Sequence, residues 1–144
     1  MPGWLLLGLI ALGLPRTILA DLGIVAPESS SIYYVLALTP FAVWLAVAVC
    51  RRTGSPIKDH LVAGTLYGLS LVIVHEALWA AGSSLGHHPL QSAVRLAERF
   101  SPPLRELVLH GYALVIAMTI GLGVGLTAGV VAAVARRART IRAR

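Results

Sequence analysis

Four long runs of apolar residues dominate this chain, at residues 4–26, 32–50, 61–82 and 107–134. A helix rises about 1.5 Å per residue, so roughly 20 apolar residues are needed to cross the hydrocarbon core of a bilayer. Hydrophobic residues make up 57% of the 144 residues and charged residues only 12%, whereas about a quarter of the residues of a soluble domain are charged. We therefore predict an all-α fold: one integral membrane domain, residues 1–144, built as a four-helix bundle.

The first apolar run contains Pro15, Arg16 and Asp21. A signal peptide cleaved after Ala20 is an alternative interpretation of this segment. Against it, no Lys or Arg precedes the apolar core, and Ile18 is larger than the small residue that a cleavage site prefers. We expect this segment to remain as the first membrane helix.

The longest connection between the predicted spans contains an amphipathic segment at residues 89–100. Its apolar residues recur at helical spacing and share one face: Leu90, Ala93, Val94, Ala97 and Phe100. This pattern predicts a short helix that lies in the membrane interface or caps the bundle.

The distribution of basic residues predicts the orientation of the spans. The loop at 51–60 and the tail at 135–144 together carry eight Lys and Arg residues, against three in the connection between the last two spans. Basic residues favour the cytoplasmic side, so we expect a protein of the inner (cell) membrane with both termini in the cytoplasm. The arginine-rich tail should attract anionic lipid headgroups, and we expect no nucleic-acid partner.

Ionisable residues inside apolar runs are costly in lipid unless they are paired or used. Under the predicted topology, those of this chain gather in one layer toward the outer side: Arg16, Asp21, His75, Glu76 and His110. One interpretation is structural, with Arg16 paired to Asp21 or Glu76 so that the charges lock the helices together. A second is a proton- or ion-handling site, because histidine titrates near neutral pH and carboxylates relay protons or bind cations.

A metal site is a third interpretation of this layer, with His75, Glu76, His110 and one of His87 or His88 as ligands. Adjacent helical residues point about 100° apart, so His75 and Glu76 cannot easily hold one ion together. We therefore assign no metal ligand, and the sequence identifies no cofactor.

Small residues recur every four positions in the last apolar run: Ala113, Ala117, Gly121, Gly125, Gly129 and Ala133. Such a stripe allows close approach of two helix backbones, which is how helices associate in lipid. It predicts a helix-packing face. The partner is either another span of the chain, such as that of Gly64 and Gly68, or a second protein in a homo-oligomer or larger complex.

Nothing in the sequence indicates nucleophilic catalysis, and the single Cys50 excludes a disulfide framework. The abundance of Ala, Leu, Val and Gly and the preference for Arg over Lys are typical of a GC-rich bacterial genome. We expect a small bacterial multi-pass membrane protein that is not an enzyme and works as an oligomer or an accessory subunit. The alternative is a proton- or ion-coupled transport protein, or a membrane-embedded metalloenzyme, that uses the polar layer.

Overall fold

The computed structural model describes residues 2–25, 30–51, 53–81 and 90–142. These residues form five helices and no strand. In chain order the helices are α1 (Gly3–Asp21), α2 (Ser31–Cys50), α3 (Pro56–Ala81), α4 (Gln91–Ala97) and α5 (Pro102–Arg142). All but α4 are long and apolar enough to cross a membrane.

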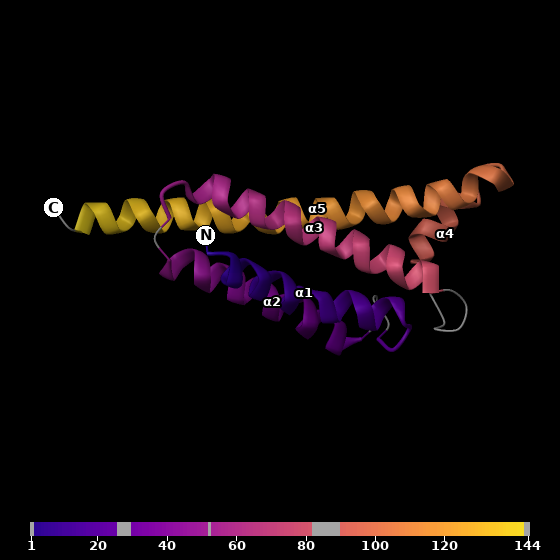
Figure 1. The fold of residues 1–144 in the computed structure, drawn as a ribbon, viewed down its shortest axis with the longest axis horizontal. Coiled ribbons are helices and arrows are strands. Elements are labelled where there is room, and N and C mark those ends of the chain that lie inside the picture. The colour runs from indigo at the N-terminus through magenta and orange to yellow at the C-terminus, as the bar shows by residue number, and fades with distance from the viewer. Residues whose placement is uncertain (1, 26–29, 52, 82–89, 143–144) are drawn as a thin grey trace.

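The long helices run alternately up and down and form two packed pairs. Helix α3 packs closely against α5 over its first half and diverges from it toward the end where α4 lies, and the α1–α2 hairpin packs beside this pair (Figure 1). Helix α5 is the longest element and extends beyond α3 at both ends (Figure 1). The alternation brings both chain ends to the same side of the bundle.

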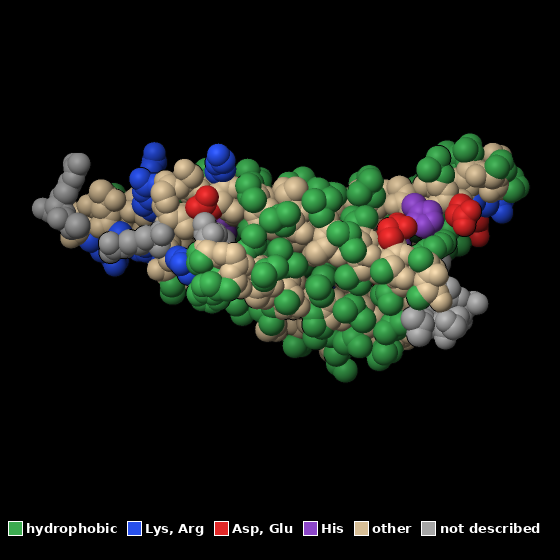
Figure 2. Space-filling model, viewed as in Figure 1, with side chains coloured by type: hydrophobic (Ala, Val, Ile, Leu, Met, Phe, Trp, Pro, Cys, Tyr) green, Lys and Arg blue, Asp and Glu red, His purple; other side chains and the backbone are tan. Residues whose placement is uncertain are grey.

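On the face seen in Figure 2, charged side chains and histidines lie toward the two ends of the molecule. Hydrophobic side chains cover the middle of this face, and Lys and Arg gather where the C-terminus lies. Histidine and acidic side chains gather at the opposite end of the same face (Figure 2). An apolar belt between two polar ends is the surface that a bilayer requires.

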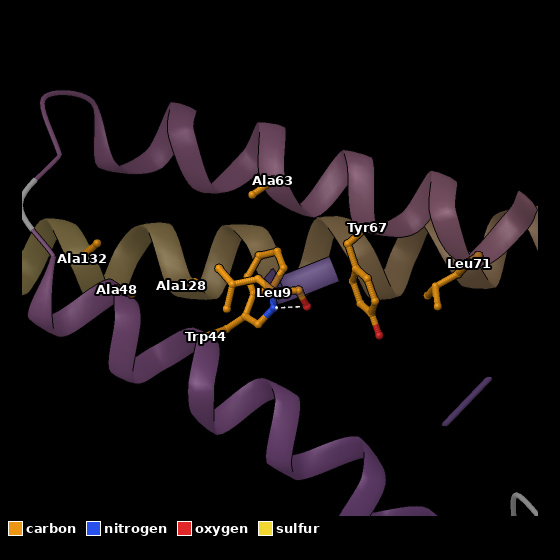
Figure 3. Packing of buried hydrophobic residues seen from close by; sticks show 9 residues of the cluster. Leu9, Trp44, Ala48, Ala63, Tyr67, Leu71, Ala128 and Ala132 are labelled. Carbon is orange, nitrogen blue, oxygen red and sulfur yellow. Dashed lines mark hydrogen bonds between the residues drawn. The ribbon is translucent and has the colours of Figure 1, made fainter. Parts of the chain in front are cut away.

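The core lies where α1 and α2 meet α3 and α5, and aromatic side chains fill it (Figure 3). The Trp44 indole is almost fully buried and donates its Nε1–H to the Leu9 carbonyl over 3.2 Å. The Tyr67 hydroxyl donates to the Gly13 carbonyl over 3.4 Å. A Cβ at Gly13 would overlap the Tyr67 ring, so glycine at this position lets the ring approach α1.

Helix α1 ends at Asp21, five residues before the end of the expected span. Gly23 adopts a positive φ of 68°, a left-handed conformation that glycine adopts without a Cβ penalty. The amides of Ile24 and Val25 turn back to the Leu19 carbonyl. This arrangement is a common way for a helix to terminate.

The third and fourth expected spans lie within longer helices. Helix α3 begins at Pro56, which suits the first turn because that turn needs no amide donor. Helix α5 runs from Pro102 to Arg142, so most of the expected tail at 135–144 is helical. Alanine and arginine are strong helix formers, and after Gly129 no glycine or proline interrupts the segment.

Helix α4 covers Gln91–Ala97 rather than the expected 89–100, of which residue 89 lies outside the described residues. It packs on α5 through the buried Ala93 and Ala97, and the Tyr112 hydroxyl donates to Ser92 over 3.1 Å. Residues 98–100 form a turn between α4 and α5. Ser101 precedes Pro102, and because a residue before proline disfavours helical geometry, α4 does not continue into α5.

Candidate functional site

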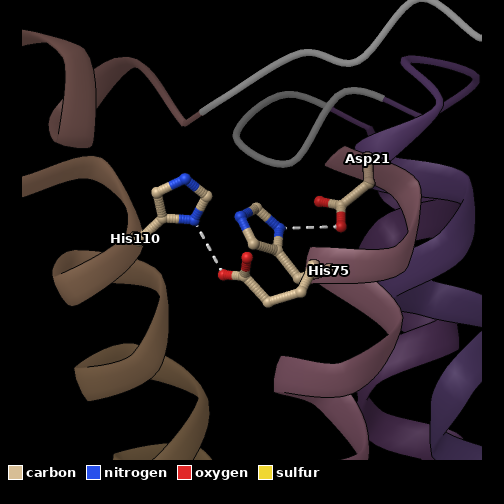
Figure 4. Close-up of polar contacts among 4 residues, drawn as sticks. Asp21, His75 and His110 are labelled. Atoms are coloured by element: carbon tan, nitrogen blue, oxygen red, sulfur yellow. Dashed lines mark hydrogen bonds and ion pairs between the residues drawn. The ribbon is translucent and has the colours of Figure 1, made fainter. Parts of the chain in front are cut away.

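The candidate site is a polar layer at the end of the bundle opposite the chain termini. It brings together Asp21 at the last position of α1, His75 and Glu76 in the final turns of α3, and His110 in α5 (Figure 4). Because α1 and α3 run in the same direction, their C-terminal ends carry these groups to one level. The layer therefore joins three helices that are far apart in the sequence.

Asp21 and His75 form the more buried of two histidine–carboxylate pairs. Nδ1 of His75 lies 3.0 Å from Oδ2 of Asp21, and the side chains are 16% and 15% exposed, respectively. An ionised carboxylate only accepts hydrogen bonds, so Nδ1 of His75 is the donor. The bond holds the ring in one orientation and becomes a charge-assisted pair when the ring is protonated.

Glu76 and His110 form the second pair, which links α3 to α5. Nδ1 of His110 lies 2.9 Å from Oε1 of Glu76, and these side chains are 31% and 43% exposed, respectively. Since adjacent helical residues point about 100° apart, His75 turns toward α1 while Glu76 turns toward α5 (Figure 4). Two neighbouring residues of α3 thereby attach this helix to α1 and to α5.

The ring of Trp79 lies near both histidines and closer to His110. Its centroid lies 4.7 Å from that of His110 and 6.1 Å from that of His75. Trp79 is one turn after His75 on α3, so the same helix face carries both rings. Trp79 thus adds a ring contact to the histidine of each pair.

Arg16 was expected to pair with Asp21 or Glu76, but both carboxylates are paired with histidines. The Arg16 guanidinium instead donates to the Tyr33 hydroxyl over 3.3 Å and lies 5.4 Å from the centre of the Tyr33 ring. Tyr33 belongs to α2, so this contact ties α2 to α1 at the level of the layer. A cation over an aromatic ring is a favourable arrangement where water is excluded.

A small cavity of about 100 Å³ lies beside the buried pair. Arg16, Asp21, Tyr33 and His75 supply its polar wall, and Ala113 and Ile116 of α5 supply part of its apolar wall. The space is sufficient for several water molecules, and its polar groups are of the kind that hold buried water. Asp21 and His75 therefore border a space that can hold water.

The small-residue stripe of α5 lies mostly against α3 of the same chain. A Cβ at Gly121 would overlap the backbone of Gly64 and Gly68, and a Cβ at Gly125 would lie 2.5 Å from the His60 carbonyl oxygen. A Cβ at Gly129 would lie 3.0 Å from Cα of Ile57. The backbones of α3 and α5 are thus in direct contact at these positions.

The other three residues of the stripe differ in their surroundings. Ala117 is buried next to Gly68. Ala113 lines the cavity of the polar layer, and Ala133 lines an open groove at the opposite end of α3.

Sequence reasoning missed His60, which is only 1% exposed and lies in the contact between α3 and α5. Among the described residues, its Nδ1 has no hydrogen-bond partner. The signal was present in the sequence, because His60 precedes Gly64 and Gly68 at the same four-residue spacing and so belongs to the α3 face that meets the stripe.

Within the described ranges, no group of three His, Cys, Asp or Glu residues is arranged to hold a metal ion. His87 and His88 lie outside those ranges. Among the remaining proposed ligands, His75 binds Asp21 of α1, whereas Glu76 binds His110 of α5.

No protein-family model, curated protein or solved structure matches this chain.

Proposed function

We propose that this chain is a multi-pass protein of the cell membrane that works, without catalysis, as an accessory or self-associating subunit of a membrane complex. The observation that carries the proposal is that the ionisable groups of the layer bind one another across helices: Asp21 with His75, and Glu76 with His110. Such pairing satisfies groups that lipid would otherwise penalise and fixes the helices relative to one another. The result is a rigid apolar body suited to contact lipid and other membrane helices.

The proposed orientation has both termini in the cytoplasm of a bacterial cell. Both chain ends lie on one side of the bundle, and that side carries the larger number of Lys and Arg residues (Figure 2). Basic residues concentrate on the cytoplasmic side of inner-membrane proteins. The polar layer would then face the outer side, and α4 would lie in the outer interface with its alanines against α5.

The α1–α2 hairpin is the proposed contact surface for a partner. In the most apolar segment of each of these two helices, a smaller share of the residues is buried than in the corresponding segments of α3 and α5. The small-residue stripe of α5 was the alternative surface, but Gly121 and Gly125 already contact α3. An oligomer or partner complex would therefore use the outward faces of α1 and α2 and leave the α3–α5 contact intact.

Native mass spectrometry of the full chain, extracted gently from its membrane, tests this proposal. We expect a discrete oligomer or a co-purifying membrane protein. Leu38→Trp changes a side chain of α2 that is 62% exposed and should weaken the assembly. Leu126→Trp on α5 is the matched control, since Leu126 is also exposed. A bare monomer under conditions that retain lipid would contradict the proposal.

A second candidate function is proton-coupled transport through the layer. It is favoured by the nature of the pairs, because each joins a carboxylate to a histidine, and both partners can exchange protons. Proton flux into liposomes that contain the purified protein tests it. Glu76→Gln and His75→Ala should abolish flux while the protein remains folded. A flux no greater than that of empty liposomes would exclude this function.

A further inference from the structure

The structure carries an open groove at its basic end, where the first turn of α3 meets the C-terminal part of α5. The groove has a volume of about 880 Å³, and its polar wall includes Lys58, Arg136, Arg137 and Thr140. A second hollow of about 330 Å³ shares Arg136 and Thr140 with this groove and is also lined by Arg51 and Arg139. Basic side chains from two helices and the loop between α2 and α3 therefore converge on one region.

This region is held in shape by a contact between distant parts of the chain. The Arg136 guanidinium donates to the Gly54 carbonyl over 2.7 Å and so fixes the loop before α3 against α5. Thr53, in the same loop, lines the second hollow, and its buried hydroxyl has no partner among the described residues. A buried hydroxyl without a partner is costly, and an anion or water in the hollow would satisfy it.

The groove continues into an apolar hollow along α3. The two share Ile57 and Lys58, and the apolar hollow, of about 550 Å³, extends along Leu61, Val62 and Leu66. A ligand that spans both would meet cationic groups at one end and aliphatic side chains at the other. This gradient distinguishes a phospholipid from a soluble phosphate, because only the lipid has acyl chains to cover the apolar hollow.

We propose that this groove binds one anionic phospholipid, with its phosphate among Lys58, Arg136 and Arg137 and an acyl chain along Ile57–Leu66. Arginine and lysine are the side chains that bind phosphate in proteins. Asp59 is the one described acidic residue at this end of the bundle, and five basic residues outweigh it: Arg51, Lys58, Arg136, Arg137 and Arg139. The proposal deepens the proposed membrane function and rests on it.

Native mass spectrometry in mixed micelles of phosphatidylglycerol and phosphatidylcholine, at equal concentrations, tests the site. We expect wild-type protein to retain phosphatidylglycerol in preference to phosphatidylcholine. Lys58→Gln and Arg137→Gln should each lower the retained anionic lipid about fivefold, which corresponds to about 1 kcal/mol for one basic residue near a headgroup. Arg142→Gln is the matched control, because it removes the same charge from α5 outside both hollows, and it should change retention less than twofold.

Three results would overturn the proposal. Equal losses for Arg137→Gln and Arg142→Gln would indicate diffuse attraction to the whole basic end. Equal retention of both lipids would show that the anionic headgroup is not recognised. Displacement of the lipid by millimolar glycerol 3-phosphate, which has no acyl chain, would assign the site to a soluble phosphate.

Two controls separate this site from the rest of the protein. Thermal unfolding of each variant without added lipid shows whether the fold is intact, and both changed side chains are exposed. Resistance of the protein to alkaline extraction from membranes tests membrane insertion itself. A wild-type protein that stays in the membrane but shows no lipid selectivity refutes the groove alone, whereas extraction of the wild-type protein refutes the proposed function.

Discussion

Replacing Gly125 with alanine should destabilise the bundle, because the backbone of α3 occupies the space that the new methyl group needs. A Cβ at this position would lie 2.5 Å from the His60 carbonyl oxygen and 3.0 Å from Cα of Gly64. Non-bonded carbon atoms prefer separations of about 3.5–4.0 Å. The two helices must therefore separate by about 1 Å at this level, since backbone atoms cannot rotate away as a side chain can.

The expected magnitude follows from the cost of overpacking a core, which is about 1–3 kcal/mol. Gly123→Ala is the matched control on the same helix, because a Cβ at Gly123 would meet nothing within 4 Å. There the substitution removes only the entropic cost of a helical glycine and should stabilise by about 0.5–1 kcal/mol. The two variants should thus differ by about 1.5–4 kcal/mol in free energy of unfolding.

Reversible unfolding in mixed micelles with increasing sodium dodecyl sulfate, followed by circular dichroism, measures this difference. The oligomeric state of each variant should be determined in parallel, so that a loss of assembly is not mistaken for a loss of bundle stability. If Gly125→Ala proves as stable as Gly123→Ala, the α3–α5 contact described here is refuted. The stripe would then be free to bind a second chain.

Three further experiments test the layer and the core with the same unfolding assay. In a double-mutant cycle, Asp21→Asn and His75→Ala should show a coupling of about 1–3 kcal/mol, and additive effects would contradict the pair. Trp44→Phe should cost about 1 kcal/mol, because the Leu9 carbonyl loses its buried donor; an unchanged stability would mean that this bond is not formed. His60→Leu should leave stability unchanged or raise it, because the buried Nδ1 has no described partner, and a large loss would reveal one.

The sequence predicted the all-α class and the presence of four membrane-length helices, because both depend on composition and on the length of apolar runs. It predicted the bounds of α2 to within one residue but not the C-terminal ends of α1 and α5. Gly23 stops α1 through its backbone conformation, although Ile24 and Val25 continue the apolar run. Conversely, α5 continues through several arginines to Arg142, because arginine has a high helix propensity although it is charged.

Because the spans alternate in direction, the position of a residue within its span gives its height along the bundle. The sequence could therefore place the ionisable residues at one end of the bundle. Their partners depend on the rotation of each helix about its axis, which hydropathy does not determine. Reasoning from charge alone therefore favoured Arg16 as the partner of Asp21 or Glu76, whereas the histidines occupy both carboxylates and Tyr33 receives Arg16. His60 lay at the edge of an apolar run, where a histidine resembles a loop residue, and only its spacing from Gly64 indicated burial.

His60, which is buried, and His75, which is partly buried, bear on whether one chain can carry protons across a membrane. His60 and His75 are separated by 15 positions, or about 22 Å along the helix. Between them the backbone of α3 meets that of α5 at Gly64 and Gly68 too closely to admit a Cβ without a shift, and hence too closely to admit a file of water. On the other side, Tyr67 is the one described titratable group between the two levels, and its ring is packed against Gly13. Neither the α3–α5 contact nor the packed Tyr67 ring therefore offers a hydrated route between the levels of His60 and His75. Proton transport would therefore need a path along another side of the bundle or between chains. Because an oligomer is also expected for the accessory function, proton flux in liposomes, and not the oligomeric state, separates the two proposed functions.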